Sequence, residues 1–454
     1  MEQINSPEDT ICAVSTPPGC GGIAVVRVSG PDALAVVDRL WSGATLADVK
    51  THTAHLGTVS TPDGEPLDQA VATVFRGPRS FTGQDTVEIS VHGSVYIQQQ
   101  LLQSLVAAGA RMAEPGEFTR RAFVNGRLDL AEAEAVADMI ASTSRAAHRL
   151  AISQLQGRFS SHISDLHDRL LTLASLLELE LDFSEEDVTF ADRQKLRELA
   201  LEVKATVDRL ASTFSSGQAL REGIPVTILG EPNVGKSRLL NALLDADRAI
   251  VSDIPGTTRD TVEDTMEIQG TLYRFIDTAG LRATDDPVER LGIARALDKA
   301  ARAHIVLWVT TAQSPATPQT EAQIRQAMPA DSTLLKIINK IDLADPGSQP
   351  SDAIPTSALT GAGIDRLKSE IHRITTAELP ADESMIVTNA RHHAALRSAS
   401  QALDDLLAGL DNGLTPDLLA EHLRVSIAHL ASITGNITST QILNTIFSRF
   451  CIGK

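Results

Sequence analysis

The chain has 454 residues, of which 43% are hydrophobic and 22% are charged, and this length predicts two or three globular domains. Its formal net charge of −18 opposes broad binding to a phosphate backbone, although a local basic face could still hold a folded RNA. No apolar run reaches the roughly 18 to 20 residues of a membrane span, and three cysteines (Cys12, Cys20 and Cys451) are too few for a disulfide scaffold or a zinc site.

The first 122 residues predict a compact α+β domain. The opening "MEQINSPEDTICAV" lacks the basic segment and apolar stretch of a secretory signal, so we expect a cytoplasmic protein. Short β-like runs follow, among them "GGIAVVRVSGP", "DQAVATVFRGP" and "DTVEISVHG". Gly, Pro and Asp bound these runs, as is typical of strands separated by turns.

Two later stretches, 123–216 and 377–454, predict one all-α domain of long amphipathic helices. The run "DLAEAEAVADMIASTSRAAHRLAISQLQGRF" is rich in Ala, Leu and Glu and lacks proline. "ADRQKLRELALEVKATVDRLASTF" continues this pattern, which resumes in "ARHHAALRSASQALDDLLAGL" and "PDLLAEHLRVSIAHLASI". Four leucines recur at helical spacing on one face, as expected for a packed bundle: Leu166, Leu170, Leu173 and Leu177.

Residues 217–376 have an α/β pattern and are predicted to be inserted into the helical domain. An apolar strand at 226–229 precedes the loop "GEPNVGKS", which is followed by the helical "RLLNALL". The runs "HIVLWV" and "TLLKIIN" have the composition of buried parallel strands. The predicted fold class is therefore a multidomain α/β protein.

The loop "GEPNVGKS" has the form G-x-x-x-x-G-K-S and predicts a phosphate-binding loop. Its backbone N–H groups and the positive end of the following helix favour phosphate oxygens. Lys236 should reach the β- and γ-phosphates, and the Ser237 hydroxyl should bind Mg²⁺. The alternative is a chance match in a glycine turn, which the flanking strand and helix disfavour.

Four further motifs follow in the order of a Ras-like GTPase. "GTTRD" offers Thr258 as a second Mg²⁺ ligand, and in "DTAG" Asp277 can hold the metal's water shell while Gly280 senses the γ-phosphate. In "NKID", Asp342 can accept both guanine N–H donors, which adenine lacks, and "TSAL" supports the base. The candidate GTP-binding residues are Asn233, Val234, Gly235, Lys236, Ser237, Arg238, Ser252, Thr257, Thr258, Asp277, Thr278, Ala279, Gly280, Asn339, Lys340, Asp342, Ser357, Ala358 and Leu359.

The residue that orients the attacking water must differ from that of many small GTPases. Leu281 follows "DTAG" at the position where those proteins carry glutamine, and a leucine cannot orient water. The candidates are Asp285, Asp286 and Glu289, each of which could equally be a solvated loop carboxylate. A positive charge is also needed in the transition state, where an arginine finger contributes about 10³ to 10⁵ in rate.

Several motifs together resemble the bacterial tRNA-modification GTPases over the whole chain: "TPPGCGGIAVVRVSGP", "GEPNVGKS", "IVSDIPGTTRD", "DTAGLRATDDPVERLGIARA" and the closing "FCIGK". The resemblance implies a homodimer that joins an FAD-dependent partner, as a heterotetramer, and acts on tRNA. The implied activity adds an aminomethyl or carboxymethylaminomethyl group at C5 of the wobble uridine, U34. GTP hydrolysis would drive a conformational change.

The resemblance also implies a K⁺-dependent hydrolysis. In this family K⁺ occupies the place of an arginine finger when the GTPase domains dimerise, and a fixed charge there offsets charge that develops in the transition state. The matching K⁺ ligands are Asn233, Ser252, Ile254 and Thr257. The family's water-orienting carboxylate falls on Glu289, which is thereby favoured as the catalytic residue.

By the same resemblance, the N-terminal domain is a folate-binding and dimerisation module that holds 5-formyl-tetrahydrofolate. The implied contacts are Arg27, Glu88, Arg127 and Lys454 of the C-terminal tail. Cys451 lies near them as a candidate nucleophile, which would require a depressed thiol pKa. Without the resemblance, Arg27 would be interpreted as a solvent-facing strand residue and Arg127 as a charge at a helix start.

Two alternative functions use the same motifs. One is a GTPase switch that acts in ribosome assembly without modification chemistry; the lack of an obvious basic or aromatic RNA face in the added domains disfavours it. The other is a folate enzyme with a regulatory GTPase attached.

Overall fold

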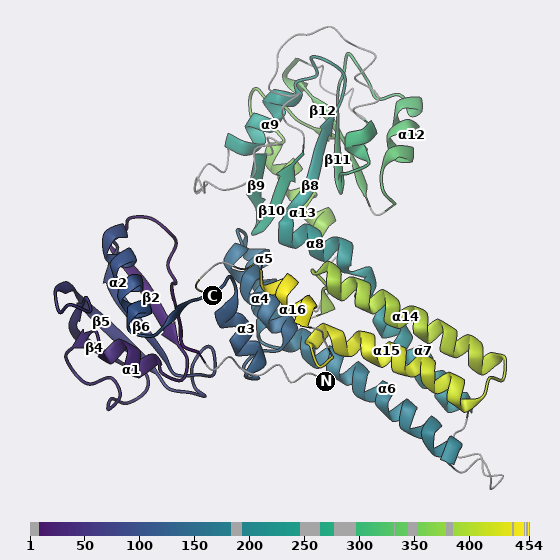
Figure 1. The fold of residues 1–454 in the computed structure, drawn as a ribbon. Helices are drawn as coiled ribbons and strands as arrows, with labels where there is room; N and C mark the ends of the chain where they lie inside the picture. The colour runs from purple at the N-terminus through teal and green to yellow at the C-terminus, as the bar shows by residue number, and fades with distance from the viewer. Residues whose placement is uncertain are drawn as a thin grey trace. The chain divides into compact units, whose positions relative to one another are not determined.

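The structure is a computed structural model that describes residues 9–182, 193–245, 264–276, 297–330, 332–343, 352–377, 385–437, 440–448, 450 and 453. The chain divides into two compact units. The first comprises Met1–Ala137, Gln154–Val203 and Ser398–Lys454, and the second comprises Asp138–Ser153 and Lys204–Arg397. Each unit has its own β-sheet (Figure 1).

The first unit contains a seven-stranded sheet in the order β3-β4-β5-β6-β2-β1-β7. Neighbouring strands are antiparallel except for the parallel pair β1 and β7. The three predicted runs are confirmed as β2, β5 and β6. The bounds are β1 Ile11–Val14, β2 Ile23–Ser29, β3 Trp41–Ser42, β4 Thr53–Ser60, β5 Pro66–Phe75, β6 Thr86–His92 and β7 Arg111–Met112.

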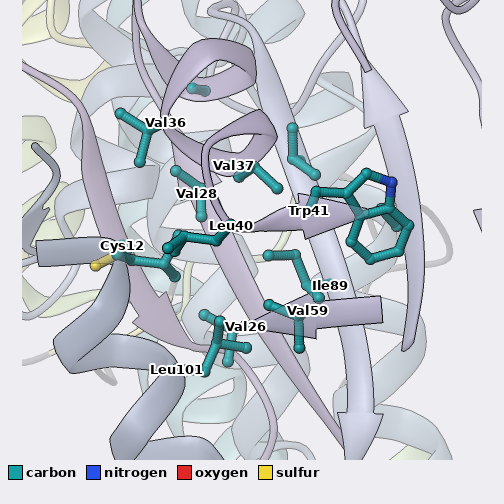
Figure 2. Packing of buried hydrophobic residues seen from close by; sticks show 14 of the residues in the cluster. Cys12, Val26, Val28, Val36, Val37, Leu40, Trp41, Val59, Ile89 and Leu101 are labelled. Atoms are coloured by element: carbon teal, nitrogen blue, oxygen red, sulfur yellow. The ribbon is translucent and has the colours of Figure 1, made fainter. Parts of the chain in front are cut away.

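Two helices, α1 (Ala33–Asp38) and α2 (Val95–Ala107), cover one face of this sheet. Figure 2 shows Val26 and Val28 of β2 in the same cluster as Leu101 of α2. Strand alternation buries one set of side chains and leaves the other outside. On the outer face, the paired residues Leu56 and Val71 are 66% and 37% exposed.

The predicted helical run at residues 129–159 is divided among α4, α5 and the start of α6, whereas α14 and α15 match the predicted runs 390–410 and 416–433 to within one residue. The bounds of these and the neighbouring helices are α3 Glu117–Val124, α4 Leu130–Ala141, α5 Arg145–Leu155, α6 Arg158–Asp182, α7 Arg193–Ser212, α14 Ala390–Asp411, α15 Pro416–Thr434 and α16 Thr440–Phe447. Gly157, at φ +72°, separates α5 from α6, because a left-handed residue ends a helix. The predicted leucine face is confirmed: Leu170 of α6 is fully buried and Leu166, Leu173 and Leu177 are nearly so.

A buried ion network fixes α3 against the first described residues. The Arg121 guanidinium, which is fully buried, donates to Asp9 Oδ1 at 2.7 Å and to Glu117 Oε1 at 2.9 Å. Arg111 donates to the same two carboxylates, each at 2.7 Å. Burial alone would raise the pKa of Glu117, but hydrogen bonds from Arg111, from the Glu114 N–H and from Arg121 outweigh it and lower this pKa. The hydrogen bond from Arg111 likewise lowers the pKa of Asp9.

These lowered pKa values predict a loss of stability in acid. Because the folded pKa values lie below the unfolded ones, the contribution is present above about pH 4 to 5 and is lost as the pH falls. Trp41 and Trp308 are the two tryptophans, so Trp41 fluorescence in a Trp308→Phe background reports on the first unit. We expect its urea midpoint to fall between pH 7 and about pH 3, and to fall less in Glu117→Gln. An equal fall with and without Glu117→Gln would show that the lowered pKa of Glu117 does not contribute to this loss of stability.

The second unit contains a six-stranded sheet in the order β13-β12-β11-β8-β10-β9, parallel except for the pair β9 and β10. The predicted strands are confirmed as β8, β11 and β12. Helices α9 and α13 pack on one face, and α12 packs on the other. The bounds are β8 Ile224–Leu229, β9 Asp264–Ile268, β10 Thr271–Phe275, β11 Ile305–Thr311, β12 Thr333–Asn339, β13 Ile354–Pro355, α8 Phe214–Glu222, α9 Lys236–Asp245, α12 Pro318–Ala327, α13 Ile364–Ala377 and a 3₁₀ turn at Ile341–Leu343.

Within the described part of the chain, no helix is both long and apolar enough to cross a membrane.

Candidate functional site

The predicted phosphate loop lies between β8 and α9, at the carboxyl end of a central parallel strand. Gly230 and Gly235 have positive φ angles of 152° and 96°. A Cβ atom at Gly230 would lie 2.3 Å from the Val309 carbonyl oxygen, and one at Gly235 would lie 2.5 Å from Asn339 Nδ2. Both positions therefore require glycine, for the backbone conformation and for space. The sequence folds locally into a loop whose backbone can approach a phosphate closely.

Lys236, the first residue of α9, lies over the backbone of this loop. Its Nζ donates to the carbonyl oxygens of Gly230 and Glu231, both at 2.8 Å. Burial and then the charge of Lys299 lower the pKa of Lys236, while Glu231 opposes this shift. A bound phosphate would offer the ammonium group a charged acceptor in place of two neutral carbonyls. The exposed Ser237 follows in the first turn of α9 and Arg238 lies next to it.

Asn339, at the end of β12, joins the phosphate loop to the predicted guanine loop. Its side chain is almost fully buried, donates to the Val234 carbonyl at 2.8 Å and accepts from the Ala358 N–H at 3.0 Å. The next residue, Lys340, donates from Nζ to the Asn233 carbonyl at 2.6 Å. The structure thus brings "GEPNVGKS", "NKID" and "TSAL" together.

Asp342 lies in the 3₁₀ turn after β12, where the Ser357 hydroxyl donates to its Oδ1 at 2.5 Å. This bond orients the carboxylate, which could accept the two parallel N–H groups of guanine. Leu359, from the same loop as Ser357, is 64% exposed. An apolar surface beside a polar acceptor is typical of a site for a flat base.

The remaining candidates of the nucleotide site lie outside the described residues. They are Ser252, Ile254, Thr257, Thr258, Asp277, Thr278, Ala279, Gly280, Asp285, Asp286 and Glu289. Of the predicted metal ligands, Ser237 for Mg²⁺ and Asn233 for K⁺ are described, and both are exposed.

A second group of candidates meets in the first unit around Arg27. The Arg27 side chain is 13% exposed, and its Nε and Nη2 contact Oε1 of Glu88 at 2.9 and 2.8 Å. Its guanidinium carbon lies 5.4 and 5.5 Å from the ring centres of Phe81 and Phe118. A guanidinium at this distance from the face of an aromatic ring is attracted to the ring by a cation–π interaction. The interpretation of Arg27 as a solvent-facing strand residue is therefore wrong.

The end of the chain returns to this group. The Gly453 carbonyl accepts from Arg27 Nη1 at 3.3 Å and from Ser15 Oγ at 3.1 Å. Gly453 has φ +95°, and a Cβ atom there would lie 2.2 Å from the Val14 carbonyl. Its neighbours Cys451 and Lys454 lie outside the described residues. Gly453 itself is buried beside Arg27 and Ser15.

Arg127 is not brought into contact with Arg27 or Glu88 by any hydrogen bond within the described residues. Its side chain is exposed and passes close to Gly83, where a Cβ atom would lie 3.2 Å from Arg127 Cγ. Sequence reasoning missed Phe81 and Phe118, whose partner Arg27 lies far away along the chain. It also missed the bridging role of Asn339, although the motif "NKID" contains that residue.

Two known protein families match this chain. The MnmE helical domain family matches residues 130–451, and the GTP-binding protein TrmE N-terminus family matches residues 10–127. A solved structure of Aquifex aeolicus Era matches 39% of this chain and 66% of that chain, with 29% identity and a TM-score of 0.26.

Curated relatives match almost the whole chain. The Parabacteroides distasonis protein named tRNA modification GTPase MnmE is 47% identical over 98% of this chain and 100% of its own length. The Cytophaga hutchinsonii protein of the same name is 45% identical over 99% of each chain. With this identity and coverage, the chain belongs to the MnmE family of tRNA modification GTPases.

Proposed function

We propose that this tRNA modification GTPase hydrolyses GTP in a K⁺-dependent reaction and, with an FAD-dependent partner, modifies C5 of the wobble uridine U34 of certain tRNAs. The group added would be aminomethyl or carboxymethylaminomethyl, and GTP hydrolysis would drive a conformational change. The observation that carries the proposal is the junction of the three nucleotide motifs by Asn339 and Lys340. In these motifs, the Lys236 ammonium group can bind the triphosphate and the Asp342 carboxylate can bind the guanine base.

The proposed metal ions use residues at the mouth of the phosphate loop. Ser237 would hold Mg²⁺ together with Thr258, and the Mg²⁺ ion would neutralise charge on the β- and γ-phosphates. Asn233, exposed and at φ +64°, would bind K⁺ with Ser252, Ile254 and Thr257. The K⁺ ion would supply a fixed positive charge near the transferred phosphate. Lys236 would move from the loop carbonyls to the phosphates.

The test of the K⁺ requirement is single-turnover GTP hydrolysis in KCl and in NaCl at equal ionic strength. We expect hydrolysis at least about tenfold faster in KCl, because an arginine finger that supplies comparable charge contributes about 10³ to 10⁵. GTP affinity measured in both salts is the control for binding. Equal slow rates in the two salts, with GTP bound in both, would exclude K⁺ as the activating charge.

Glu289 is the proposed water-orienting carboxylate. Replacing it with alanine should lower the hydrolysis rate by about 10² or more and leave GTP binding intact, since positioning by general-base groups contributes about 10² to 10⁴. Asp286→Ala is the matched control from the same acidic segment and should retain most activity. Equal losses of binding and hydrolysis in Glu289→Ala would contradict this role.

The N-terminal domain is proposed to bind 5-formyl-tetrahydrofolate through Arg27, Glu88, Arg127 and Lys454, with Cys451 nearby. Two features support this. Arg27 is oriented by Glu88 and two aromatic rings, and both of its contacts with Glu88 use the single oxygen Oε1. A second carboxylate oxygen could therefore accept a ring N–H of a folate.

Further parts of the proposal concern assembly and location. The exposed pair Leu56 and Val71 on the outer sheet face supports a homodimer through this domain, because apolar outer faces favour association. The proposed assembly with the FAD-dependent partner is a heterotetramer in the cytoplasm. The proposed domains are 1–122, 123–216 with 377–454, and an inserted GTPase domain at 217–376.

Two measurements separate the proposal from its alternatives. Stoichiometric binding of 5-formyl-tetrahydrofolate would disfavour a ribosome-assembly switch. Loss of the wobble-uridine modification in a deletion strain would separate a modification GTPase from a folate enzyme that merely carries a regulatory GTPase.

A further inference from the structure

The turn between β9 and β10 forms a backbone contact with the start of α5, all within the second unit. Gln269 and Gly270 both have positive φ, 49° and 87°, as in a tight two-residue hairpin turn. The Gly270 carbonyl accepts a hydrogen bond from the Ala146 N–H at 2.8 Å. A Cβ atom at Gly270 would lie 3.1 Å from Arg145 Cβ. Glycine thus permits both the turn and its close approach to α5.

The contact uses one of the N–H groups in the first turn of α5, which have no acceptor within the helix itself. Ser144 precedes the helix, and its Oγ accepts from the Ala147 N–H at 3.2 Å. The Ala146 N–H needs a separate acceptor, which the hairpin provides. The Gly270 carbonyl therefore lies at the positive end of the α5 dipole, which strengthens this hydrogen bond. A shift of the turn would weaken the bond, because hydrogen bonds depend steeply on distance and angle.

The α5 helix connects this turn to the strand that carries the phosphate loop. Leu150 of α5 packs in a cluster with Leu220 of α8 and Ile386. The α8 helix passes through Gly223 directly into β8. Movement of the hairpin turn can therefore be transmitted to α8 by packed side chains.

The hairpin itself connects two predicted nucleotide-sensing segments. β9 begins at Asp264, shortly after the predicted Mg²⁺ ligand Thr258, and β10 ends at Phe275, shortly before Asp277. We propose that the Gly270–Ala146 hydrogen bond is a coupling contact through which the bound nucleotide changes the position of α5 relative to the hairpin. The proposal rests on GTP binding at the site described above, since a ligand can shift only an equilibrium whose two states it distinguishes.

Hydrogen exchange of the full-length protein tests the coupling. The probes are the peptide spanning residues 143–150 and the peptide of α8, residues 214–222, each compared with GDP and with guanosine 5′-(β,γ-imido)triphosphate at saturating concentrations. We expect the exchange rate of each peptide to differ at least about threefold between the two nucleotides, since local opening responds to the loss of one backbone hydrogen bond. The same rate in both states would overturn the proposal.

Ala146→Pro removes the donated N–H at a position in the first helical turn, where proline is tolerated. We expect this variant to bind both nucleotides within about twofold of the wild type but to lose the nucleotide-dependent difference in exchange of α8. Ser144→Ala is the matched control, because it weakens the start of the same helix and leaves the Gly270 contact in place. It should keep the difference.

Failure of the coupling is distinguishable from failure of the proposed function. If neither nucleotide binds the wild-type protein, the GTP site itself is refuted and the coupling falls with it. If both nucleotides bind and α8 retains its difference in Ala146→Pro, only the coupling contact is refuted.

Discussion

Replacing Asp342 with asparagine should weaken GTP binding by about 10²- to 10⁴-fold. The carboxylate is expected to accept two guanine N–H groups, and each hydrogen bond to a charged group contributes about 1.5 to 3 kcal/mol. With about 1.4 kcal/mol for each factor of ten, the loss of both bonds gives this range. Ser357 holds Oδ1 of Asp342 in place, so the acceptor is oriented before the base arrives.

The measurement is a titration with GTP and with xanthosine triphosphate. Xanthine carries a carbonyl where guanine has an amino group, so the asparagine side chain can donate to it and should restore tight binding. Restored binding would show that the variant is folded and that base recognition has changed. Asp365→Asn, an exposed change in the first turn of α13, is the control and should leave GTP affinity unaltered. Unchanged GTP affinity in Asp342→Asn would refute the assigned role.

Replacing Arg121 with methionine should destabilise the first unit by about 3 kcal/mol. Breaking one partner of a buried ion pair costs about 3 to 5 kcal/mol, because the other charge is left without its counter-ion. Glu117, whose side chain is fully buried, would keep Arg111 as a partner, which places the expected cost at the lower end. The carbonyl of Asp9 and the side chain of Gln84 would also lose hydrogen bonds from Arg121.

Arg120→Met is the matched control on the same helix. Arg120 is partly exposed, and its nitrogen lies 3.8 and 3.9 Å from the carboxylates of Glu114 and Glu117, so its loss should cost less than about 1 kcal/mol. Urea unfolding followed by Trp41 fluorescence in a Trp308→Phe background measures both variants. Equal midpoints for Arg120→Met and Arg121→Met would show that the buried network adds no stability.

The strands and the nucleotide loop could be predicted from the sequence because their signals are local. The phosphate loop between β8 and α9 follows from glycines at fixed spacing, and β11 and β12 follow from unbroken apolar runs. The leucine face of α6 follows from helical periodicity. The breaks before α5 and α6 were missed, because helix-forming composition continues through them and a single glycine carries the stop signal at Gly157.

The order of the motifs, the carboxylate of Asp342 and the ammonium group of Lys236 can be identified from the amino-acid sequence alone. Which side chains meet in space depends on the tertiary fold. Arg27 contacts Gly453 across 426 residues, and Arg121 contacts Asp9 across 112. The hydrogen bond between Ala146 and Gly270 likewise joins residues that are far apart in the sequence. Such contacts leave no periodic pattern, because they depend on how separate elements pack and on which buried polar groups still need a partner.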